Sequence, residues 1–352
     1  MPSSPIDRLA PERSALLERL LPAGVPLLWC PLLTHYTAEG ALDTARASRH
    51  LAFLQKSVKG YLVPGSTGDG WQLDEAQVRE LLEFMLVQAR EREFSVLIGV
   101  LATSTEDVLR KLEDTMAWLR RRTGGASDED CLRQASVCGF TVCPPKGREL
   151  TQAQIHDALD RVLATGLPIS LYQLPQITEN EMAADTVEAL ARKHTNFLLL
   201  KDTSGEDRVA AAGFREAFLV RGAEGGYARH LSLGGGAYDG LLLSTANCFG
   251  PQYAEMIEHL QQDRTAPAQA LSDRIERVAG EVFAAAAALP YGNAFTNANK
   301  AIDHFMAHGP QARTIAGPRL HSGHRLPDEL IDLAGNVLAR QGLMPAHGYL
   351  AA

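Results

Sequence analysis

The chain has 352 residues, of which 45% are apolar and 22% are charged, and its formal net charge is −8. This composition is typical of a globular protein whose core is large enough to fold without disulfides. The acidic balance argues against nucleic acid or an anionic membrane surface as a partner, because both favour a basic face. No segment approaches the ~18 consecutive apolar residues that span a bilayer.

The five cysteines are an odd number, and their spacing fits neither a disulfide framework nor a zinc site. Free thiols suit a reducing compartment. The first eight residues lack the apolar core of a signal peptide. We therefore expect a cytoplasmic protein without a bound metal.

Short apolar runs alternate with longer segments of helical period, which is typical of βαβ units. We predict strands at residues 25–32, 60–64, 95–101, 136–143, 168–174, 197–200, 218–222 and 240–243. Helices are expected at 41–56, 74–91, 105–122, 152–164, 181–193, 206–218 and 251–262, with a polar surface loop at 122–130. Because most strands are apolar throughout, they predict a parallel sheet covered by helices.

Eight such units fit an α/β fold of the closed (β/α)8 TIM-barrel type, although an open, doubly wound sheet has a similar pattern. We assign residues 1–265 to the barrel, with a short N-terminal extension. Residues 266–352 contain no expected strand. They predict helices at 268–288, 297–307 and 328–341, which form a C-terminal extension packed on the barrel.

In a parallel barrel, the residues that carry chemistry lie where the strands end. Four unusual segments stand at such ends: Gly65-Ser66-Thr67-Gly68-Asp69-Gly70, Tyr172-Gln173-Leu174-Pro175, Lys201-Asp202-Thr203-Ser204-Gly205, and Gly234-Gly235-Gly236 with Asp239-Gly240. Each segment alone carries little information. The predicted fold, however, brings all four to one rim.

Lys201 directly follows the apolar run 197–200, so we expect its amine at the mouth of an apolar barrel. Desolvation disfavours an ammonium ion, and a neutral amine can attack a ketone to form a Schiff base. The alternative is a lysine that extends to the rim or pairs with Asp202. Tyr172 ends the neighbouring strand, where its phenol could relay protons or could simply cover the barrel core.

Other polar positions are less specific. The turn at 65–70 offers backbone N–H groups and two hydroxyls, which suit a carboxylate or a phosphate. It matches neither the phosphate-loop nor the dinucleotide fingerprint. His304 and His308 have a metal-ligand spacing but lie outside the expected mouth, so we expect surface or packing roles. His35 is a candidate for lining the pocket, with an ordinary loop role as the alternative.

Together these motifs resemble the dihydrodipicolinate synthase / N-acetylneuraminate lyase family of class I aldolases, over about residues 25–310. Residues 65–69 are similar to the family's Gly-Thr/Ser-Thr-Gly-Glu motif, and residues 172–175 to its Tyr-x-x-Pro motif. Residues 201–205 are similar to its Schiff-base lysine segment, and Asp239-Gly240 precedes a Ser-Thr-Ala-Asn run at 244–247. The order and spacing of the motifs agree with the family.

The resemblance implies that Lys201 holds a 2-keto acid as an imine and that Tyr172 is the proton shuttle. It also implies a set of substrate-binding positions: Ser66, Thr67, Gly68, Thr203, Gly222 and Leu242. The family uses no metal or organic cofactor, because the lysine itself supplies the electron sink. Its members are usually tetramers, so we expect a homo-oligomer that acts on a small, pyruvate-like 2-keto acid.

Two positions depart from the synthase branch of the family. That branch has an arginine two residues after the Tyr-x-x-Pro proline, where this chain has Ile177. It also has a tyrosine pair after the fourth strand, where this chain reads Cys143-Pro144-Pro145-Lys146-Gly147. Both departures argue against lysine biosynthesis. Lys146 is a candidate for holding an anionic substrate tail, and a solvated loop lysine is the alternative.

The sequence therefore favours a class I lyase that cleaves or forms the C–C bond between pyruvate and an aldehyde, in a 2-keto-3-deoxy sugar acid or a related pyruvate adduct. Three alternatives stay open. The same imine could serve a sugar-acid dehydratase or a 4-hydroxy-tetrahydrodipicolinate synthase. A barrel without catalytic activity could bind a small carboxylate or serve as an assembly partner.

Overall fold

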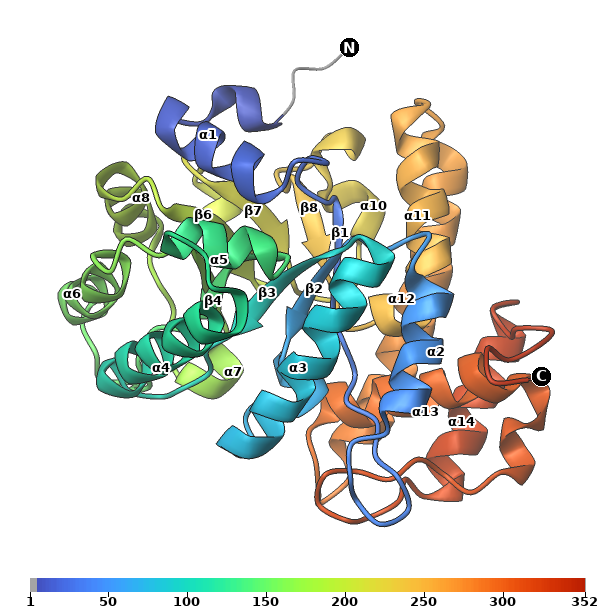
Figure 1. Cartoon of the computed structure of the whole chain (residues 1–352). Helices are drawn as coiled ribbons and strands as arrows, with labels where there is room; N and C mark the ends of the chain where they lie inside the picture. Colours follow the sequence, from blue (N-terminus) through green and yellow to red (C-terminus); the bar gives the residue numbers. More distant parts are fainter. Residues whose placement is uncertain (1–4, 352) are drawn as a thin grey trace.

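The computed structural model describes residues 5–351, which form a parallel barrel surrounded by helices (Figure 1). Residues 1–4, part of the segment in which we expect no signal peptide, lie outside the described residues. Eight strands in the described part pair in chain order, and β8 pairs with β1 to close the barrel. The predicted TIM-barrel class is confirmed, and the open sheet is excluded.

The strands are β1 (Leu28–Pro31), β2 (Gly60–Val63), β3 (Ser95–Gly99), β4 (Val137–Val142), β5 (Ile169–Gln173), β6 (Phe197–Asp202), β7 (Phe218–Arg221) and β8 (Gly240–Leu242). Nearly every strand residue is buried. Strands enclosed between a packed barrel interior and an outer layer of helices require apolar side chains on both faces. The continuous apolar runs of the sequence thus correspond directly to the barrel strands.

The helices are α1 (Pro11–Leu20), α2 (Thr44–Leu54), α3 (Glu75–Arg92), α4 (Thr105–Thr123), α5 (Asp128–Gln134), α6 (Gln152–Leu163), α7 (Pro175–Thr178), α8 (Ala184–Lys193), α9 (Arg208–Ala211), α10 (Tyr227–His230), α11 (Ala246–Gln261), α12 (Thr265–Ala287), α13 (Ala294–His308) and α14 (Asp328–Arg340). Short 3-10 helices lie at η1 (Pro5–Arg8), η2 (Ser66–Gly68), η3 (Ser232–Gly234) and η4 (Gly309–Thr314). Capping boxes start α3, through Asp74 and Gln77, and α6, through Thr151 and Gln154.

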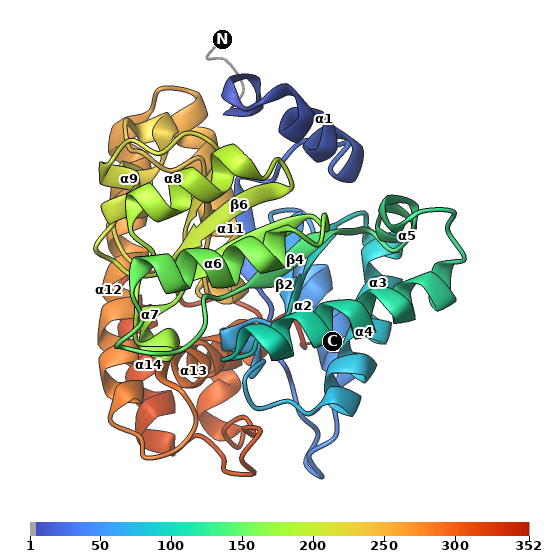
Figure 2. The same cartoon turned by 90° about the vertical axis from the view of Figure 1, so that its left-hand side faces the viewer.

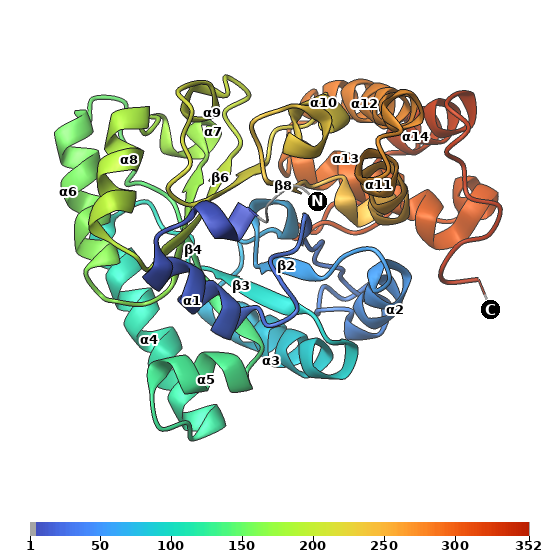
Figure 3. The ribbon, with the colours of Figure 1, turned by 90° about the horizontal axis from the view of Figure 1, so that it is seen from above.

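Helix α1 covers one end of the barrel, whereas α13 and α14 lie toward the other end (Figures 1 and 2). Figure 3, which looks onto the first of these ends, shows α1 lying across it. The buried Arg13 of α1 donates to the carbonyl oxygens of Phe197, at 2.7 Å, and His194, at 2.9 Å. These bonds fix α1 where β6 begins, so the opposite end, where β6 ends, is left for the functional site.

The prediction of a loop at residues 122–130 is wrong over most of this segment. Helix α4 continues to Thr123, and α5 begins after Ser127, whose side chain accepts a hydrogen bond from the N–H of Asp130. Three acidic residues in the first turn of α5 give the segment the composition of a solvated loop. They are stabilising at a helix N-terminus, however, and Cys131 and Leu132 of the same helix are buried.

Other helix bounds also differ from the prediction. The helix expected at 206–218 is reduced to the single turn α9, since Gly213 follows with a left-handed φ of +81°. Helix α13 begins at Ala294 rather than at residue 297, because the Asn293 side chain caps it by accepting from the N–H of Thr296. The extra turn of α13 proves important for the site.

Several absences hold within residues 5–351. No helix there combines the length and the apolar character needed to cross a membrane. No group of His, Cys, Asp and Glu side chains is arranged to hold a metal. All five cysteines are free and buried. His304 is buried, and its Nε2 lies 3.0 Å from the carbonyl oxygen of Ala312, which agrees with a packing role.

Burial makes the protein sensitive to acid. Desolvation lowers the pKa of His35, His50 and His304, and it lowers that of His308 from 6.5 to about 4. As the pH falls, these histidines therefore become protonated in the unfolded chain at a higher pH than in the folded chain. We expect the free energy of unfolding to be greatest above pH 6.5 and to decrease as the pH falls from 6.5 toward 4.

This sensitivity can be measured by chemical unfolding at several pH values. His308→Gln removes one group that titrates between pH 6.5 and 4, so the variant should lose stability less steeply over that range than the parent does. Equal slopes for the two proteins would contradict the assignment of a lowered pKa to His308.

Candidate active site

A cavity lies around the side chain of Lys201 and contains about 280 Å³ of space not filled by atoms. Its lining residues are Pro31, Ser66, Thr67, Tyr172, Leu174, Lys201, Thr203, Gly222, Ser244 and Phe295. Most of them stand at or just beyond the C-terminal ends of the strands. The structure thus brings together six of the residues predicted from the sequence: Ser66, Thr67, Tyr172, Lys201, Thr203 and Gly222.

Lys201 and Tyr172 are direct neighbours across two strands. They stand opposite each other in the register of β6 and β5, and the Nζ atom of Lys201 lies 3.9 Å from the centre of the Tyr172 ring. Their exposed fractions are 3% and 2%. Asp202, the alternative partner for Lys201, instead accepts from the Ser204 hydroxyl at 2.7 Å and from Tyr238 at 3.3 Å. The lysine amine is thus directed to an aromatic face within the cavity.

Gly222 leaves the space that the lysine occupies. A Cβ atom at this position would lie 2.7 Å from Cε of Lys201 and 2.3 Å from Oγ1 of Thr203. Oγ1 of Thr203 is buried and has no hydrogen-bond partner. A buried hydroxyl without a partner costs free energy. This one lines the cavity beside the amine, so it is available to a polar ligand.

The loop that carries Ser66 and Thr67 is held by the C-terminal helix α13. The side chain of Thr296 donates to the carbonyl oxygen of Thr67 at 3.0 Å, and that of Asn293 donates to the carbonyl oxygen of Ser66 at 3.4 Å. The indole N–H of Trp71 donates to Oγ of Ser66 at 2.9 Å. An indole is a donor only, so it orients the Ser66 hydroxyl but cannot pass a proton onward.

A buried ion pair fixes the end of this loop. Nζ of Lys300 on α13 lies 3.2 Å from Oδ2 of Asp69, which also accepts from the Tyr36 hydroxyl at 3.0 Å. Lys300 lies over the Tyr36 ring, with Nζ 4.5 Å from the ring centre. Burial lowers the pKa of Lys300, and the Asp69 carboxylate opposes this effect. Helix α13 thus holds the proposed carboxylate-binding loop through both hydrogen bonds and charge.

Two predicted substrate-binding residues do not line the cavity. Gly68 is buried. Its carbonyl accepts from the Thr34 hydroxyl at 2.7 Å, and a Cβ atom there would lie 2.3 Å from the carbonyl oxygen of Leu32. Leu242 is fully buried within the main hydrophobic core. Both residues therefore support the site from within the fold rather than by facing its cavity.

The two less specific candidates also lie elsewhere. Nζ of Lys146 is 3.0 Å from Oε1 of Glu179, and both side chains are more than two-fifths exposed. Nε2 of His35 is 3.0 Å from Nδ1 of His50, and both rings are buried. Neither residue lines the cavity around Lys201.

Four lining residues were not assigned to the site from the sequence: Pro31, Leu174, Ser244 and Phe295. Leu174 and Ser244 belong to segments that we had singled out. Phe295 comes from the first turn of α13, beyond the barrel. The pattern Asn293-x-x-Thr296 is a helix N-cap signal that would have extended α13 to include it.

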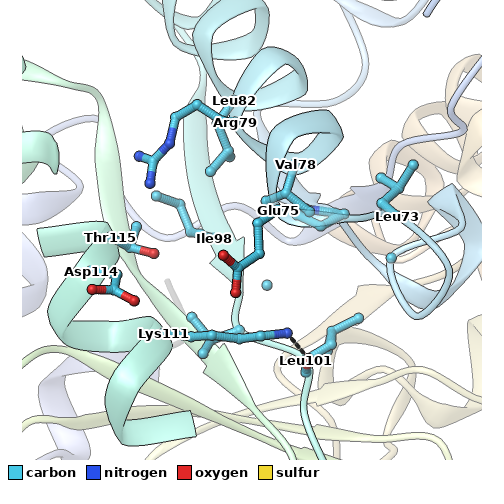
Figure 4. Close-up of a pocket in the computed structure, with 14 residues that line it drawn as sticks. Leu73, Glu75, Val78, Arg79, Leu82, Ile98, Leu101, Lys111, Asp114 and Thr115 are labelled. Atoms are coloured by element: carbon cyan, nitrogen blue, oxygen red, sulfur yellow. Dashed lines mark hydrogen bonds between the residues drawn. The ribbon is translucent and has the colours of Figure 1, made fainter. Parts of the chain in front are cut away.

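A larger crevice, of about 640 Å³, lies between α3 and α4 and shares no lining residue with the cavity around Lys201. Glu75 and Lys111 point into it from the two helices (Figure 4), and Lys111 donates to the carbonyl oxygen of Leu101 at 2.9 Å. We assign the chemistry to the smaller cavity, because only that one combines a buried amine, a phenol and an unpartnered hydroxyl.

Comparisons with known proteins identify similar chains and folds. The dihydrodipicolinate synthetase family profile matches residues 132–297. A 4-hydroxy-tetrahydrodipicolinate synthase of Stenotrophomonas maltophilia (strain R551-3) is 32% identical over 234 residues, which cover 64% of this chain and 71% of the relative. A protein of Coccidioides immitis (strain RS), named as a mitochondrial 4-hydroxy-2-oxoglutarate aldolase, is 26% identical over 250 residues and covers 66% and 71% of the two chains.

Among solved structures, the prophage protein YagE of E. coli K12, in complex with pyruvate, superposes with a TM-score of 0.67. The match covers 90% of this chain and 98% of that protein, at 20% sequence identity. At this identity, the likeness supports the barrel fold and nothing further.

The close approach of Gly222 to Lys201 lets us predict the effect of adding one methyl group at position 222. Gly222→Ala should lower kcat by about 10²-fold by displacing the amine, since small displacements of a reacting group have effects of this size. The variant should still fold, because the two atoms that would lie within 3.0 Å of the new methyl group belong to side chains. Gly280→Ala is the matched control, since a Cβ atom there meets nothing within 4 Å. Wild-type turnover by Gly222→Ala would contradict the prediction.

The Asp69–Lys300 pair makes a second prediction. Lys300→Met leaves a buried carboxylate without its cation, which should cost about 3–5 kcal/mol of stability. The double variant Asp69→Asn with Lys300→Met removes both charges and should be more stable than the single variant. Denaturant unfolding of the three proteins measures this difference. Equal stability of the single and double variants would show that the charges are not coupled.

Proposed function

The chain belongs to the dihydrodipicolinate synthetase family, and on that premise we propose that it is a class I aldolase, a carbon–carbon lyase that acts through a Schiff base on Lys201. Relatives in the family are named as synthases and aldolases. The observation that carries the proposal is the buried amine of Lys201, which lies 3.9 Å from the Tyr172 ring centre in a cavity also lined by Ser66 and Thr67.

The first stage is formation of the imine. The keto acid enters with its carboxylate toward Ser66 and Thr67, whose hydroxyls and loop N–H groups suit an anion. The neutral amine of Lys201 attacks the C2 carbonyl, and the resulting carbinolamine loses water to give a protonated Schiff base. Tyr172, whose ring centre lies 3.9 Å from Nζ, donates the proton with which the hydroxyl leaves as water and is left as a phenolate, the base that the next stage needs. Thr203 offers its free hydroxyl to the same intermediate.

The second stage breaks the C3–C4 bond. Tyr172 takes the proton of the C4 hydroxyl, and the electron pair of the C3–C4 bond moves into the iminium. An aldehyde and an enamine result. Protonation of the enamine at C3 regenerates the imine, and hydrolysis releases pyruvate and the free Lys201 amine. The same steps in reverse condense pyruvate with an aldehyde.

We propose that the substrates are 2-keto-3-deoxy sugar acids or related pyruvate adducts. Three features weigh against the synthase reaction. Ile177 stands where the synthase branch has its arginine. Lys146, in the position of the tyrosine pair, is bound to Glu179 at the surface. The Ser66 hydroxyl accepts from the indole of Trp71, which cannot extend a proton relay.

We further propose a homo-oligomeric enzyme, a tetramer by analogy with the family, in a reducing compartment. Five free, buried thiols support a cytoplasmic setting. The Coccidioides relative is named as mitochondrial, so fractionation of the source cells is the appropriate test. Light scattering at several protein concentrations would measure the assembly.

Borohydride trapping tests the proposed chemistry. Reduction in the presence of saturating pyruvate should attach a carboxyethyl group to the peptide that contains Lys201, as read by mass spectrometry. Lys201→Arg should show no adduct. Tyr172→Phe should still be trapped but should cleave its substrate about 10²–10⁴-fold more slowly, the usual contribution of a positioned acid–base group.

An unmodified Lys201 peptide would exclude the Schiff-base mechanism. A trapped enzyme that releases a dehydrated keto acid without free pyruvate would identify a dehydratase instead. A barrel without catalytic activity would bind keto acids equally well after Lys201→Ala and would turn over none of them.

A further inference from the structure

The cavity has an apolar wall on the side of Tyr172. Leu101, Cys143, Tyr172 and Leu174 form a buried cluster, and Trp71 and Ile177 pack against it. This cluster is separate from the main hydrophobic core of the barrel. Burial raises the pKa of the Cys143 thiol to about 12, so this sulfur is uncharged at neutral pH. Tyr172 and Leu174 of this cluster line the cavity, so the wall presents aromatic and aliphatic carbon to it, and the other members pack against these two residues.

Phe295 lines the cavity from a different part of the chain. It stands in the first turn of α13 and packs edge-to-face on Phe283, with ring centres 5.5 Å apart and an interplanar angle of 85°. The flanking residues Asn293 and Thr296 are hydrogen-bonded to the loop at Ser66 and Thr67. The ring is thus supported by its neighbours before any substrate binds, and a preformed apolar surface of this kind selects its ligand by shape.

The cavity offers no second site for a negative charge. Among the described residues that line it, Lys201 is the one charged side chain. Arg221 lies beside Gly222, but its guanidinium is bound to Asp207 and to the carbonyl oxygen of Ala223 at 2.6 Å. A carboxylate at the far end of the substrate would be desolvated without a cation, which is costly.

Within residues 5–351, Ser244 is the one hydroxyl-bearing lining residue that we have not assigned to the keto acid, and its hydroxyl is already committed to internal bonds. The Ser244 hydroxyl donates to Oε1 of Glu224 at 2.5 Å and accepts from Nδ2 of Asn299 at 2.9 Å. Its single proton is therefore unavailable to a sugar hydroxyl. Glu224 also accepts from Thr245 at 2.7 Å and adds a negative charge beside Ser244. The arrangement disfavours an anionic substrate tail and offers little to a polyol.

We propose that the aldehyde half of the substrate is uncharged and apolar, and that Phe295 and Ile177 determine this specificity. The inference rests on the proposed aldolase function. Of the two substrate classes proposed there, it sets aside the 2-keto-3-deoxy sugar acids and retains the related pyruvate adducts, those of aliphatic or aromatic aldehydes. The space around Lys201 that is not filled by atoms is only about 280 Å³ and must also hold the keto acid, so the aldehyde is small.

The test is aldol condensation of pyruvate with four aldehydes, with the products quantified by mass spectrometry. Butanal and benzaldehyde are apolar, D-glyceraldehyde carries hydroxyls, and glyoxylate carries a charge. The parent enzyme should show a kcat/KM at least about tenfold higher for the better apolar aldehyde than for either polar one, a modest ratio for pocket discrimination. Preference for glyoxylate or glyceraldehyde over both apolar aldehydes would overturn the proposal.

Two variants probe the residues. Ile177→Arg places a cation at the apolar wall and should raise kcat/KM for glyoxylate relative to butanal by about tenfold or more. Ile315→Arg is the matched control, because Ile315 is a 38% exposed side chain outside the lining set, and it should leave the ratio unchanged. Phe295→Ala should lower kcat/KM for the preferred apolar aldehyde by about tenfold and leave glyoxylate unaffected.

Borohydride trapping with pyruvate alone tests the proposed aldolase function separately from the proposed aldehyde specificity. Every variant should still be trapped at Lys201, because neither substitution touches the amine. Absence of trapping in the parent would exclude the aldolase function and this inference with it. Normal trapping, combined with an aldehyde preference that neither Ile177→Arg nor Phe295→Ala changes, would overturn the role of these two residues alone.

Discussion

Burial of a lysine amine at the end of an apolar barrel is the constraint on which the rest of the site depends. An ammonium ion enclosed in this way is costly unless a carboxylate or polar groups compensate for lost water. Here the adjacent carboxylate of Asp202 is bound to Ser204 and Tyr238. Lys201 is instead left beside the Tyr172 ring and the free hydroxyl of Thr203. A structural lysine would gain from an acidic partner, whereas a nucleophile benefits from having none.

The second constraint is that the loop at Ser66 and Thr67, the proposed carboxylate-binding loop, must not move. Its residues lie between β2 and α3, but the groups that hold them come from α13, more than two hundred positions later in the chain. The C-terminal helices are therefore part of the site rather than an appendage. The buried charge of Lys300 explains why the connection is specific: Asp69 can be desolvated only where this amine and the Tyr36 hydroxyl reach it.

The sequence predicted what is local and missed what depends on distant contacts. Lys201, Tyr172 and Thr203 could be placed because each stands where an apolar strand ends, and parallel strands end at one rim. The burial of Leu242 in the main hydrophobic core could not be predicted from its own segment, because it depends on the packing of the whole barrel. Helix α5 was missed because three acidic residues look like a loop until the helix dipole is considered.

The residues assigned to the reaction and those assigned to substrate specificity also differ in this way, the first standing on the barrel strands and the second outside them. The groups assigned to imine formation stand on β5 and β6, where strand register fixes them to each other. The groups that we assign to the remainder of the substrate stand elsewhere: Ile177 lies in the single turn of α7, and Phe295 lies in the C-terminal helix α13. Surface loops and terminal helices can change without disturbing the barrel core. An isoleucine in the place of the synthase arginine therefore need not weaken the imine chemistry, but it removes the charge that an anionic second substrate would require.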